Sequence, residues 1–234
     1  MKNIYINFGG ACGHYSYLLG IAKILQDNFN LNEENIKFSG ISSGCFPALC
    51  LCLNIDIDDM YNNVNIKTLN TIQQYNSKAF FNFSPTLKDN TLFYINNIGL
   101  DLYKNANNKL LCTLTHVPTF KSNYYYDYNS NEDLIDCIMA SGHFPIYSSK
   151  LFYTFRNKYY IDGVISKYTS NNNIRTINGI NIDISCDMFR KIDTSHLFIS
   201  SCTNYSNSLY NLGKKDALDN IEYFANIIVN NNYP

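Results

Sequence analysis

The order of local patterns in the first 53 residues is the feature that most constrains the fold of this chain. An alternating, β-rich run at residues 3–8 (NIYINF) is followed by a glycine turn at 9–13 and by apolar residues at helical spacing over 15–29. The same order then repeats, with a strand-like run at 35–41 (NIKFSGI), a second glycine turn and an apolar, helix-like run. Strand, glycine turn and helix in repetition predict an α/β fold around a mainly parallel sheet.

The later part of the chain adds elements that fit the same fold. Residues 109–117 (KLLCTLTHV) predict a third core strand, and residues 131–142 predict an amphipathic helix. A hairpin is predicted to turn at Arg156-Asn157, a late strand at 196–202, and a closing helix at 214–229. We therefore expect one domain over residues 1–234.

The middle of the chain, residues 54–108, fits this alternation of strands and helices less well. It is rich in Asn and mixed in pattern, with short helical stretches at 58–61 and 91–98. Poorly patterned segments of this length in compact domains are often functional loops or covers. We expect this segment to be a lid or an insert within the single domain.

Composition excludes several classes of function. The 234 residues carry a formal net charge of −1, so no overall positive field attracts nucleic acid. The 8 cysteines form no CxxC pair, and no histidine pair lies at metal-ligand spacing, so we expect no metal and no cofactor. Free thiols and the lack of a signal peptide predict an intracellular protein. The longest apolar run, 45–53, is too short to span a bilayer, so any membrane contact is expected to be peripheral. No feature of the sequence specifies an oligomeric state.

The stretch GISSG at residues 40–44 matches the pattern G-x-S-x-G, with Ser42 at its centre. A serine between a strand and a helix lies in a sharp, exposed turn, which suits a nucleophile. Gly40 and Gly44 remove Cβ atoms where strand and helix crowd together, and the amide of Ser43 opens the helix toward a developing oxyanion. The alternative is an ordinary Gly/Ser turn at the end of a strand.

A nucleophilic serine needs a base. Asp162 or Asp187 together with His196 would complete a Ser–Asp–His triad, as in α/β-hydrolases. Against that interpretation, Ser42 follows only two visible strands, earlier than in a hydrolase of that type. His14, His116 and His143 are expected to be structural.

Three separated elements, in order, resemble the patatin-like phospholipase family. The first is the glycine loop and helix FGGACGHYSYLLGIAKIL (8–25), and the second is GISSG (40–44). The third is ASGHFPIYSSKLFYTFRNKYYIDGV (140–164), which is similar to an Ala-Ser-x-x-x-Pro stretch that runs into an Asp-Gly motif. A late stretch, GKKDALDNIEYF (213–224), resembles the closing helix of the family. Together these elements cover most of the chain, with the Asn-rich middle unmatched.

The resemblance implies a patatin-like three-layer α/β/α sandwich and a Ser–Asp dyad. Ser42 would be the nucleophile and Asp162 its base partner, with Gly163 turning the backbone sharply beside it. The glycine loop would form the oxyanion hole, with Gly10 and Ala11 as the foremost donors. The residues assigned to the oxyanion hole are Gly9, Gly10, Ala11, Cys12, Gly13 and Ser43.

The chain departs from the family pattern at two places. Ala11 and Cys12 stand where the family loop has a third glycine and an arginine, and Val164 follows Asp-Gly where Gly or Ala is usual. Three hypotheses therefore remain. The first is a serine lipid acyl hydrolase acting on phospholipids, lysophospholipids or acylglycerols. The second is a hydrolase of small esters with a triad, and the third is a catalytically impaired, lipid-binding relative.

Overall fold

A computed structural model describes residues 2–169, 179–192 and 202–230, and it has a mixed α/β architecture. The strands are β1 (Ile4–Phe8), β2 (Ile36–Ile41), β3 (Leu110–Val117), β4 (Lys121–Tyr125), β5 (Tyr153–Phe155), β6 (Lys158–Ile161) and β7 (Ile180–Ile184). They form one seven-stranded sheet in the order β5-β6-β3-β2-β1-β7, with β4 also paired to β3. The pairs within β7-β1-β2-β3 are parallel, and the pairs that involve β4, β5 and β6 are antiparallel. The predicted α/β fold class is confirmed.

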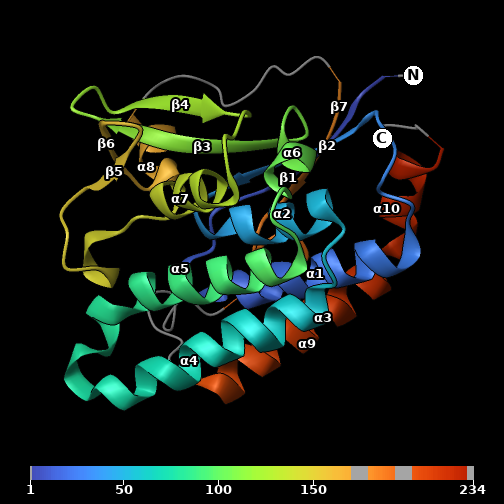
Figure 1. Cartoon of the computed structure of the whole chain (residues 1–234). Helices are drawn as coiled ribbons and strands as arrows, with labels where there is room; N and C mark the ends of the chain where they lie inside the picture. Colours follow the sequence, from blue (N-terminus) through green and yellow to red (C-terminus); the bar gives the residue numbers. More distant parts are fainter. Residues whose placement is uncertain (1, 170–178, 193–201, 231–234) are drawn as a thin grey trace.

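Helices cover both faces of this sheet (Figure 1). The helices next to the sheet are α1 (Tyr15–Asn28), α2 (Cys45–Leu53), α7 (Asn131–Ser141) and α8 (Gly163–Thr169). Helices α2 and α7 pack on the face of β3 that presents Cys112, whereas the amide of Ser166 in α8 bonds Thr115 Oγ1 on the other face. Successive side chains of a strand point to opposite faces, so α8 lies across the sheet from α2 and α7.

Two strands share one edge of β3. Strand β4 pairs with residues 112–116 of β3 along one edge. Cys112 and Thr113 pair with both β4 and β2, and Thr115 and His116 pair with both β4 and β6. A strand has only two hydrogen-bonding edges, so β2 and β6 both lie on the edge opposite β4.

These two strands approach each other head-on. Strand β2 runs parallel to β3 and ends with Ile41 opposite Thr113. Strand β6 runs antiparallel to β3 and ends with Ile161 opposite Thr115. Only one β3 residue separates the two pairs, so the residues that follow Ile41 and Ile161 must meet at the same point.

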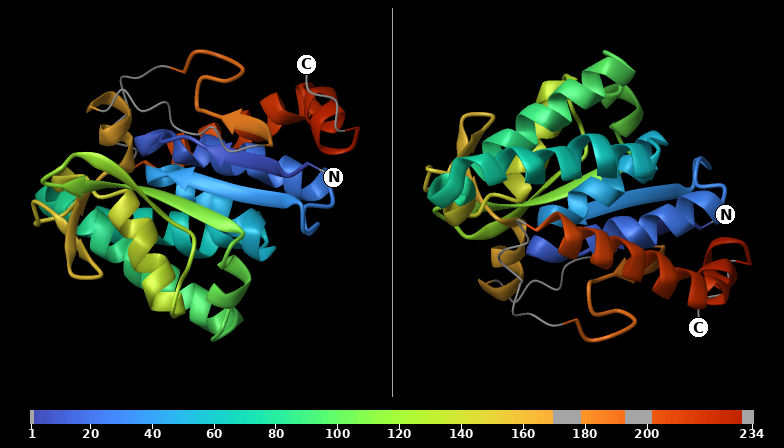
Figure 2. Two further views of the ribbon diagram at one scale, coloured as in Figure 1. Left: turned by 90° about the horizontal axis from the view of Figure 1, so that it is seen from above. Right: turned by 90° about the horizontal axis from the view of Figure 1, so that it is seen from below.

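The segment 54–108 is more helical than the sequence predicts. It contains α3 (Ile57–Met60), η3 (Tyr61–Ile66), α4 (Lys67–Ile72), η4 (Gln73–Lys78), α5 (Ala79–Ile98) and α6 (Tyr103–Ala106). The expected stretch 91–98 is only the last part of α5, which also includes Pro85. A buried polar cluster ties η3 to α1 and to α9 (Thr203–Asp219), because Asn65 donates to Ser16 Oγ (3.1 Å) and Ser206 Oγ (3.2 Å). Viewed from below, these helices and α9 lie in front of the strands (Figure 2).

The prediction of a single closing helix at 214–229 is wrong. Two helices, α9 and α10 (Ile221–Ile228), are separated at Asn220. The Asn220 side chain donates to the carbonyl of Asp216 (2.8 Å), a local bond of the kind that competes with helical hydrogen bonding. The sequence pattern also missed strands β4 and β7.

Several other predictions are confirmed. Strands at 3–8, 35–41 and 109–117 and the helix at 131–142 are present within one or two residues. Arg156 and Asn157 both have positive φ (45° and 59°), as a two-residue hairpin turn requires. The structure also shows how α7 begins, because Ser130 Oγ accepts from the amide of Asp133 (3.0 Å) and caps the helix. The late strand predicted at 196–202 lies almost wholly outside the described residues.

Candidate active site

Ser42 stands at the turn between β2 and α2. Its φ of 56° lies in the left-handed region, which a non-glycine residue adopts only where the surroundings enforce it. Its amide donates to Ser141 Oγ (2.9 Å), and its side chain is only 4% exposed. The turn therefore has the strained geometry expected of a nucleophile elbow.

The glycines that flank this turn are required by close backbone approach. A Cβ on Gly40 would lie 2.4 Å from Cα of Cys45, at the start of α2. A Cβ on Gly44 would lie 2.4 Å from the carbonyl oxygen of Gly9. Both distances are far below van der Waals contact, so glycine at these positions lets strand, helix and loop converge on Ser42.

Asp162 follows the last residue of β6 and meets Ser42 at the junction of the two strands. Ser42 Oγ donates to Asp162 Oδ2 at 2.5 Å, and the amide of Val164 donates to Asp162 Oδ1 (2.8 Å). The Asp162 backbone is also held, because its N–H donates to the carbonyl of His143 (2.9 Å) and its carbonyl accepts from Thr115 Oγ1 (2.8 Å). The sheet therefore brings together two residues that lie 120 positions apart in sequence.

Gly163 allows this arrangement. A Cβ at this position would lie 2.1 Å from the carbonyl oxygen of Thr113. A side chain here would push the first turn of α8 away from β3 and would carry Asp162 with it.

The Asp162 carboxyl group is unusually basic for an aspartate. Burial raises its pKa to about 6, and the hydrogen bonds from Ser42 and Val164 oppose this rise only in part. The group is thus ionised at neutral pH but accepts a proton more readily than an exposed aspartate.

The glycine loop passes directly beside the serine. A Cβ built on Gly10 would lie 3.2 Å from Ser42 Cβ, so the two residues are in contact. The amide of Ala11 donates to Ser43 Oγ (3.1 Å), which links the loop to the elbow. Within the described part of the chain, the amides of Gly10 and Ser43 donate to no protein group.

The rest of the loop runs into α1. The amide of Gly9 is bonded to the carbonyl of Ile184 at the end of β7 (2.8 Å), so it is already used within the fold. Cys12 has a φ of 46° and begins the 3₁₀ turn η1 (Cys12–His14), which includes Gly13 and leads into the helix. Burial, and to a lesser extent Asp162, raises the pKa of the Cys12 thiol to about 11, so this thiol is protonated at neutral pH and is a poor nucleophile.

Ser141 is a supporting residue to which the sequence analysis gave no role. Its hydroxyl donates to the carbonyl of Thr113 (2.7 Å) and accepts from the amide of Ser42 and from Cys45 Sγ (3.3 Å). It therefore fixes the turn at Ser42 to β3. The signal was present in the sequence, because Ser141 belongs to the Ala-Ser-Gly-His-Phe-Pro stretch that carries the family resemblance.

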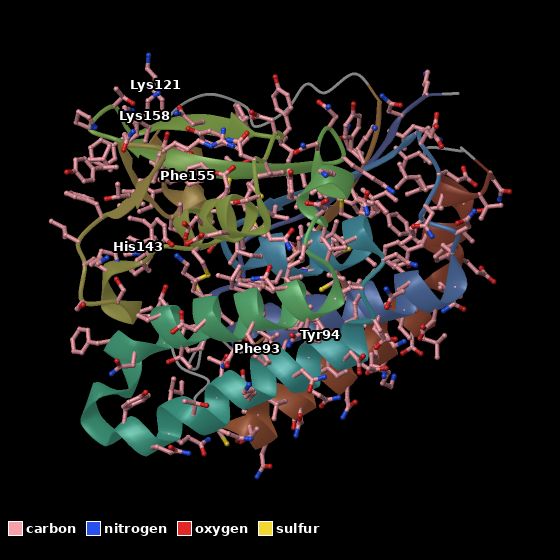
Figure 3. All side chains as sticks on the ribbon, in the orientation of Figure 1. Phe93, Tyr94, Lys121, His143, Phe155 and Lys158 are labelled. Carbon is pink, nitrogen blue, oxygen red and sulfur yellow. The ribbon has the colours of Figure 1, made fainter. Side chains whose placement is uncertain are left out.

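The three histidines within the described ranges, His14, His116 and His143, take no direct part in the hydrogen bond between Ser42 and Asp162. His143 is buried against Tyr153, with Nε2 near the carbonyl of Lys150 (3.1 Å), and burial lowers its pKa. Figure 3 shows it between the β5–β6 hairpin and α5. His14 is buried and lies 3.3 Å from the hydroxyl of Tyr205. His196 lies outside the described residues, and Asp187 accepts a hydrogen bond from Ser185.

Residues 9–177 match the family model of the patatin-like phospholipases, which is more than half of the chain. The chain belongs to this family. It is 26% identical over 168 residues to patatin-like phospholipase domain-containing protein 4 of Homo sapiens, covering 70% of this chain and 65% of that protein. It is 27% identical over 164 residues to the omega-hydroxyceramide transacylase of Mus musculus, covering 68% of this chain and 26% of that protein. The chain thus spans between about a quarter and two thirds of the length of these relatives.

Among solved structures, VipD from Legionella pneumophila matches with a TM-score of 0.48 and 13% sequence identity. The match covers 79% of this chain and 50% of that one. No helix within the described ranges combines the length and the apolar character that crossing a membrane demands.

Proposed function

We propose that this patatin-like phospholipase relative is a serine lipid acyl hydrolase that works through a Ser42–Asp162 dyad. The observation that carries the proposal is the 2.5 Å hydrogen bond from Ser42 Oγ to Asp162 Oδ2, made between two buried side chains at a strained strand-to-helix turn. Family membership supports a lipid ester as the substrate.

In the first half of the reaction Asp162 acts as the general base. Its ionised carboxylate takes the proton of Ser42 Oγ while the oxygen attacks the ester carbonyl carbon. A pKa of about 6 makes the carboxylate a stronger base than an ordinary aspartate while leaving it ionised at neutral pH. The second carboxylate oxygen stays bonded to the amide of Val164, which keeps the group oriented.

The negative charge that develops on the carbonyl oxygen needs hydrogen-bond donors. The amides of Gly10 and Ser43 are suited to this role, since they lie beside Ser42 or directly after it and donate to no group among the described residues. The amide of Ala11 joins them if the tetrahedral intermediate displaces Ser43 Oγ from it. The start of α1 just beyond the loop adds the positive end of a helix dipole.

The second half of the reaction returns the proton. Protonated Asp162 gives its proton to the alkoxide oxygen of the leaving alcohol as the carbon–oxygen bond breaks, which leaves an acyl ester on Ser42. Water then attacks this ester, Asp162 takes the proton of the water, and the same proton passes to Ser42 Oγ as the acid leaves. Every step is a proton transfer or an acyl transfer, and none requires a metal or a redox cofactor.

We propose phospholipids, lysophospholipids or acylglycerols as substrates, reached by peripheral contact with a lipid surface inside the cell. An acyl-enzyme can also pass its acyl group to an alcohol, and the similarity to omega-hydroxyceramide transacylases makes that transfer worth measuring.

A fluorophosphonate probe tests the nucleophile directly, because it phosphonylates activated serines. We expect the wild-type protein to be labelled and Ser42→Ala to be unlabelled. Ser208→Ala, an exposed serine on α9 whose hydroxyl donates to the carbonyl of Asn204 in the same helix, is the matched control and should label like the wild type. A panel of lipid classes then identifies the ester. A folded wild-type protein without Ser42-dependent label would instead support a lipid-binding protein that has lost catalysis.

Comparison of Asp162→Ala with His196→Ala separates the dyad from a triad. The dyad predicts that ester hydrolysis is lost with Asp162→Ala and kept with His196→Ala. Loss of turnover in folded His196→Ala would contradict the dyad and favour a Ser–Asp–His mechanism on small esters.

A further inference from the structure

The side chain of Val164 lies at the candidate active site and, unlike its amide, has no role in the proposed chemistry. It is the second residue of α8, two positions after Asp162, and its amide binds Asp162 Oδ1. A Cβ built on Gly10 would lie 2.5 Å from Val164 Cγ2 and 3.2 Å from Ser42 Cβ. A methyl group of Val164 thus packs against the glycine loop at the point where the loop touches the nucleophile.

This methyl group has little freedom to move. Valine in a helix is held almost entirely to one χ1 rotamer. Its backbone is fixed by the hydrogen bond to Asp162, and Gly163 before it is locked against β3. On the other side the loop is anchored through Gly9 to the end of β7. The Val164 side chain therefore forms a fixed steric barrier beside Ser42, called the wall below.

The proposed mechanism requires the oxygen of the alcohol to approach the Asp162 carboxylate, to which the amide of Val164 is bonded. Asp162 Oδ2 binds Ser42 Oγ, and the same carboxylate must reach the oxygen of the leaving alcohol to protonate it. An alcohol that attacks the acyl-enzyme must likewise place its oxygen within hydrogen-bond distance of Asp162. The carbon atoms attached to that oxygen then lie close to Asp162, where the Val164 side chain occupies space.

We propose that Val164 limits the size of the alcohol that leaves the substrate as the Ser42 acyl ester forms, and of the alcohol that later attacks this ester, so that water and slender primary alcohols react and branched or cyclic alcohols do not. The inference rests on the proposed Ser42 acyl-enzyme. Water is too small to meet the wall, so hydrolysis dominates over transfer to bulky acceptors.

The step that reports on the wall is attack on the acyl-enzyme by an added alcohol. The alcohol oxygen forms a bond to the acyl carbon, and its proton goes to the Asp162 carboxylate. The bond between the acyl carbon and Ser42 Oγ then breaks as that proton moves to Ser42 Oγ. The products are a new ester, free Ser42 and ionised Asp162.

The partition of one acyl-enzyme between acceptors gives a clean measurement. With vinyl butyrate as donor, whose leaving group is small, the enzyme is supplied with equal concentrations of methanol and cyclohexanol, and the two butyrate esters and free butyrate are quantified by gas chromatography. The ratio of products is fixed after acylation. It is therefore independent of the amount of folded enzyme and of the acylation rate, which a merely structural role of Val164 would change.

Substitutions of Val164 by smaller and by larger residues test the effect of side-chain size at this position. For Val164→Ala and Val164→Gly we expect the ratio of cyclohexyl to methyl ester to rise about tenfold or more, the effect of removing both Val164 methyl groups, and in glycine Cβ as well, from a steric barrier. Val164→Leu should lower the ratio, and Val164→Thr, which has the same shape, should keep the wild-type ratio. Val64→Ala, a buried valine in η3 rather than in the glycine loop, the turn at Ser42 or α8, is the matched control and should also keep it.

The outcomes separate this inference from the proposed function. Wild-type ratios in Val164→Ala, Val164→Gly and Val164→Leu alike would overturn the role of Val164 while leaving the acyl-enzyme in place. Absence of both esters and of free butyrate with the wild-type protein would overturn the proposed function and the inference together. An equal rise in Val64→Ala would assign the effect to general loosening and would also overturn the inference.

Discussion

At the residue scale, the Asp162 carboxyl group should set the pH dependence of activity. The base must be ionised, and burial raises its pKa to about 6. We expect kcat/KM for a soluble ester to be level above pH 7 and to fall about tenfold per pH unit below the pKa. Initial rates measured between pH 4.5 and 8.5 test this fall in kcat/KM. A profile that stays level down to pH 4.5 would contradict Asp162 as the base.

The same pKa implies that the ionised Asp162 carboxylate lowers the free energy of unfolding at neutral pH. An aspartate whose pKa is raised on folding binds protons more tightly in the native state, so stability falls as the pH rises from about 4 to about 6. Asp162→Asn removes this charge while keeping the shape. We expect the variant to be more stable than the wild type by about 1 to 3 kcal/mol at pH 7.5, with an advantage about 2 kcal/mol smaller at pH 4.5.

Urea unfolding of both proteins at the two pH values checks this prediction. Asp101→Asn, which breaks an exposed pair with Lys104, is the control and should change the free energy of unfolding by less than about 1 kcal/mol at either pH. An Asp162→Asn variant that is less stable than the wild type at pH 7.5 would show that the carboxylate is not destabilising.

The backbone of Cys12, like that of Ser42, is strained. Its φ of 46° is readily accessible only to glycine, and left-handed backbone at other residues costs roughly 1 to 2 kcal/mol. Cys12→Gly should therefore raise the free energy of unfolding by about 1 kcal/mol. Cys12→Ala is the matched control, since it removes the sulfur but keeps the Cβ, and it should give no gain. Equal effects of the two variants would place the cost in the thiol rather than in the backbone.

At the element scale, the pairing of α1 with α9 holds the helix that begins at the glycine loop. The two helices cross at a pair of glycines. A Cβ on Gly20 would lie 2.1 Å from the carbonyl oxygen of Tyr210, and a Cβ on Gly213 would lie 2.1 Å from that of Tyr17. Beside the crossing, Tyr17 donates to the buried carboxylate of Asp216 (2.8 Å), which also pairs with Arg190.

This crossing should not tolerate a methyl group. Gly213→Ala is expected to destabilise the protein by about 3 kcal/mol or more, at the upper end of the cost of overpacking, because backbone atoms must separate. Gly99→Ala is the control, since its Cβ would meet only the Leu102 side chain at 3.4 Å. Thermal unfolding followed by circular dichroism compares the two, and similar melting temperatures would contradict the proposed close packing.

The elements that could be predicted from sequence are those with a strong, locally complete pattern. Strands β1, β2 and β3 are buried and apolar, and α7 carries a full apolar face with a serine cap. Strand β4 (KSNYY) was missed because it is an exposed, polar strand on one edge of β3, so its pairing and not its composition makes it a strand. Strand β7 is short, and among the residues that the structure describes it pairs with β1 alone.

At the scale of the whole molecule, the contact between Ser42 and Asp162 could not be derived from pattern alone. It depends on β2 and β6 ending head-on along the same edge of β3, and β6 pairs there through only three residues. The sequence pattern left Asp162 and Asp187 equally open, and only the ordered family resemblance favoured Asp162. The role of Ser141 required coordinates, because it acts by bonding the amide of Ser42, just after β2, and the carbonyl of Thr113 in β3 at once.

The segment 54–108 gives the last prediction, because a lid and an integral part of the domain behave differently on unfolding. Asn65 in this segment is buried with Tyr15, Ser16 and Ser206, and Tyr61 donates to or accepts from Ser206 (2.9 Å). Such a network links the segment to α1, which begins at the glycine loop. We therefore expect the chain to unfold as one domain, in a single transition.

Urea unfolding followed by two probes tests this expectation. Circular dichroism at 222 nm reports on all helices, and Ser42-dependent fluorophosphonate labelling reports on the active site. The two midpoints should coincide in the wild type, and both should shift down together in Asn65→Ala, since removing one member of a buried network leaves its partners unsatisfied at a cost of about 1 to 3 kcal/mol. Asn62→Ala, at an exposed neighbour whose side chain donates to the carbonyl of Asp58, should shift neither midpoint appreciably. Loss of labelling at much lower urea than loss of helical signal would show that the segment opens independently, as a lid does.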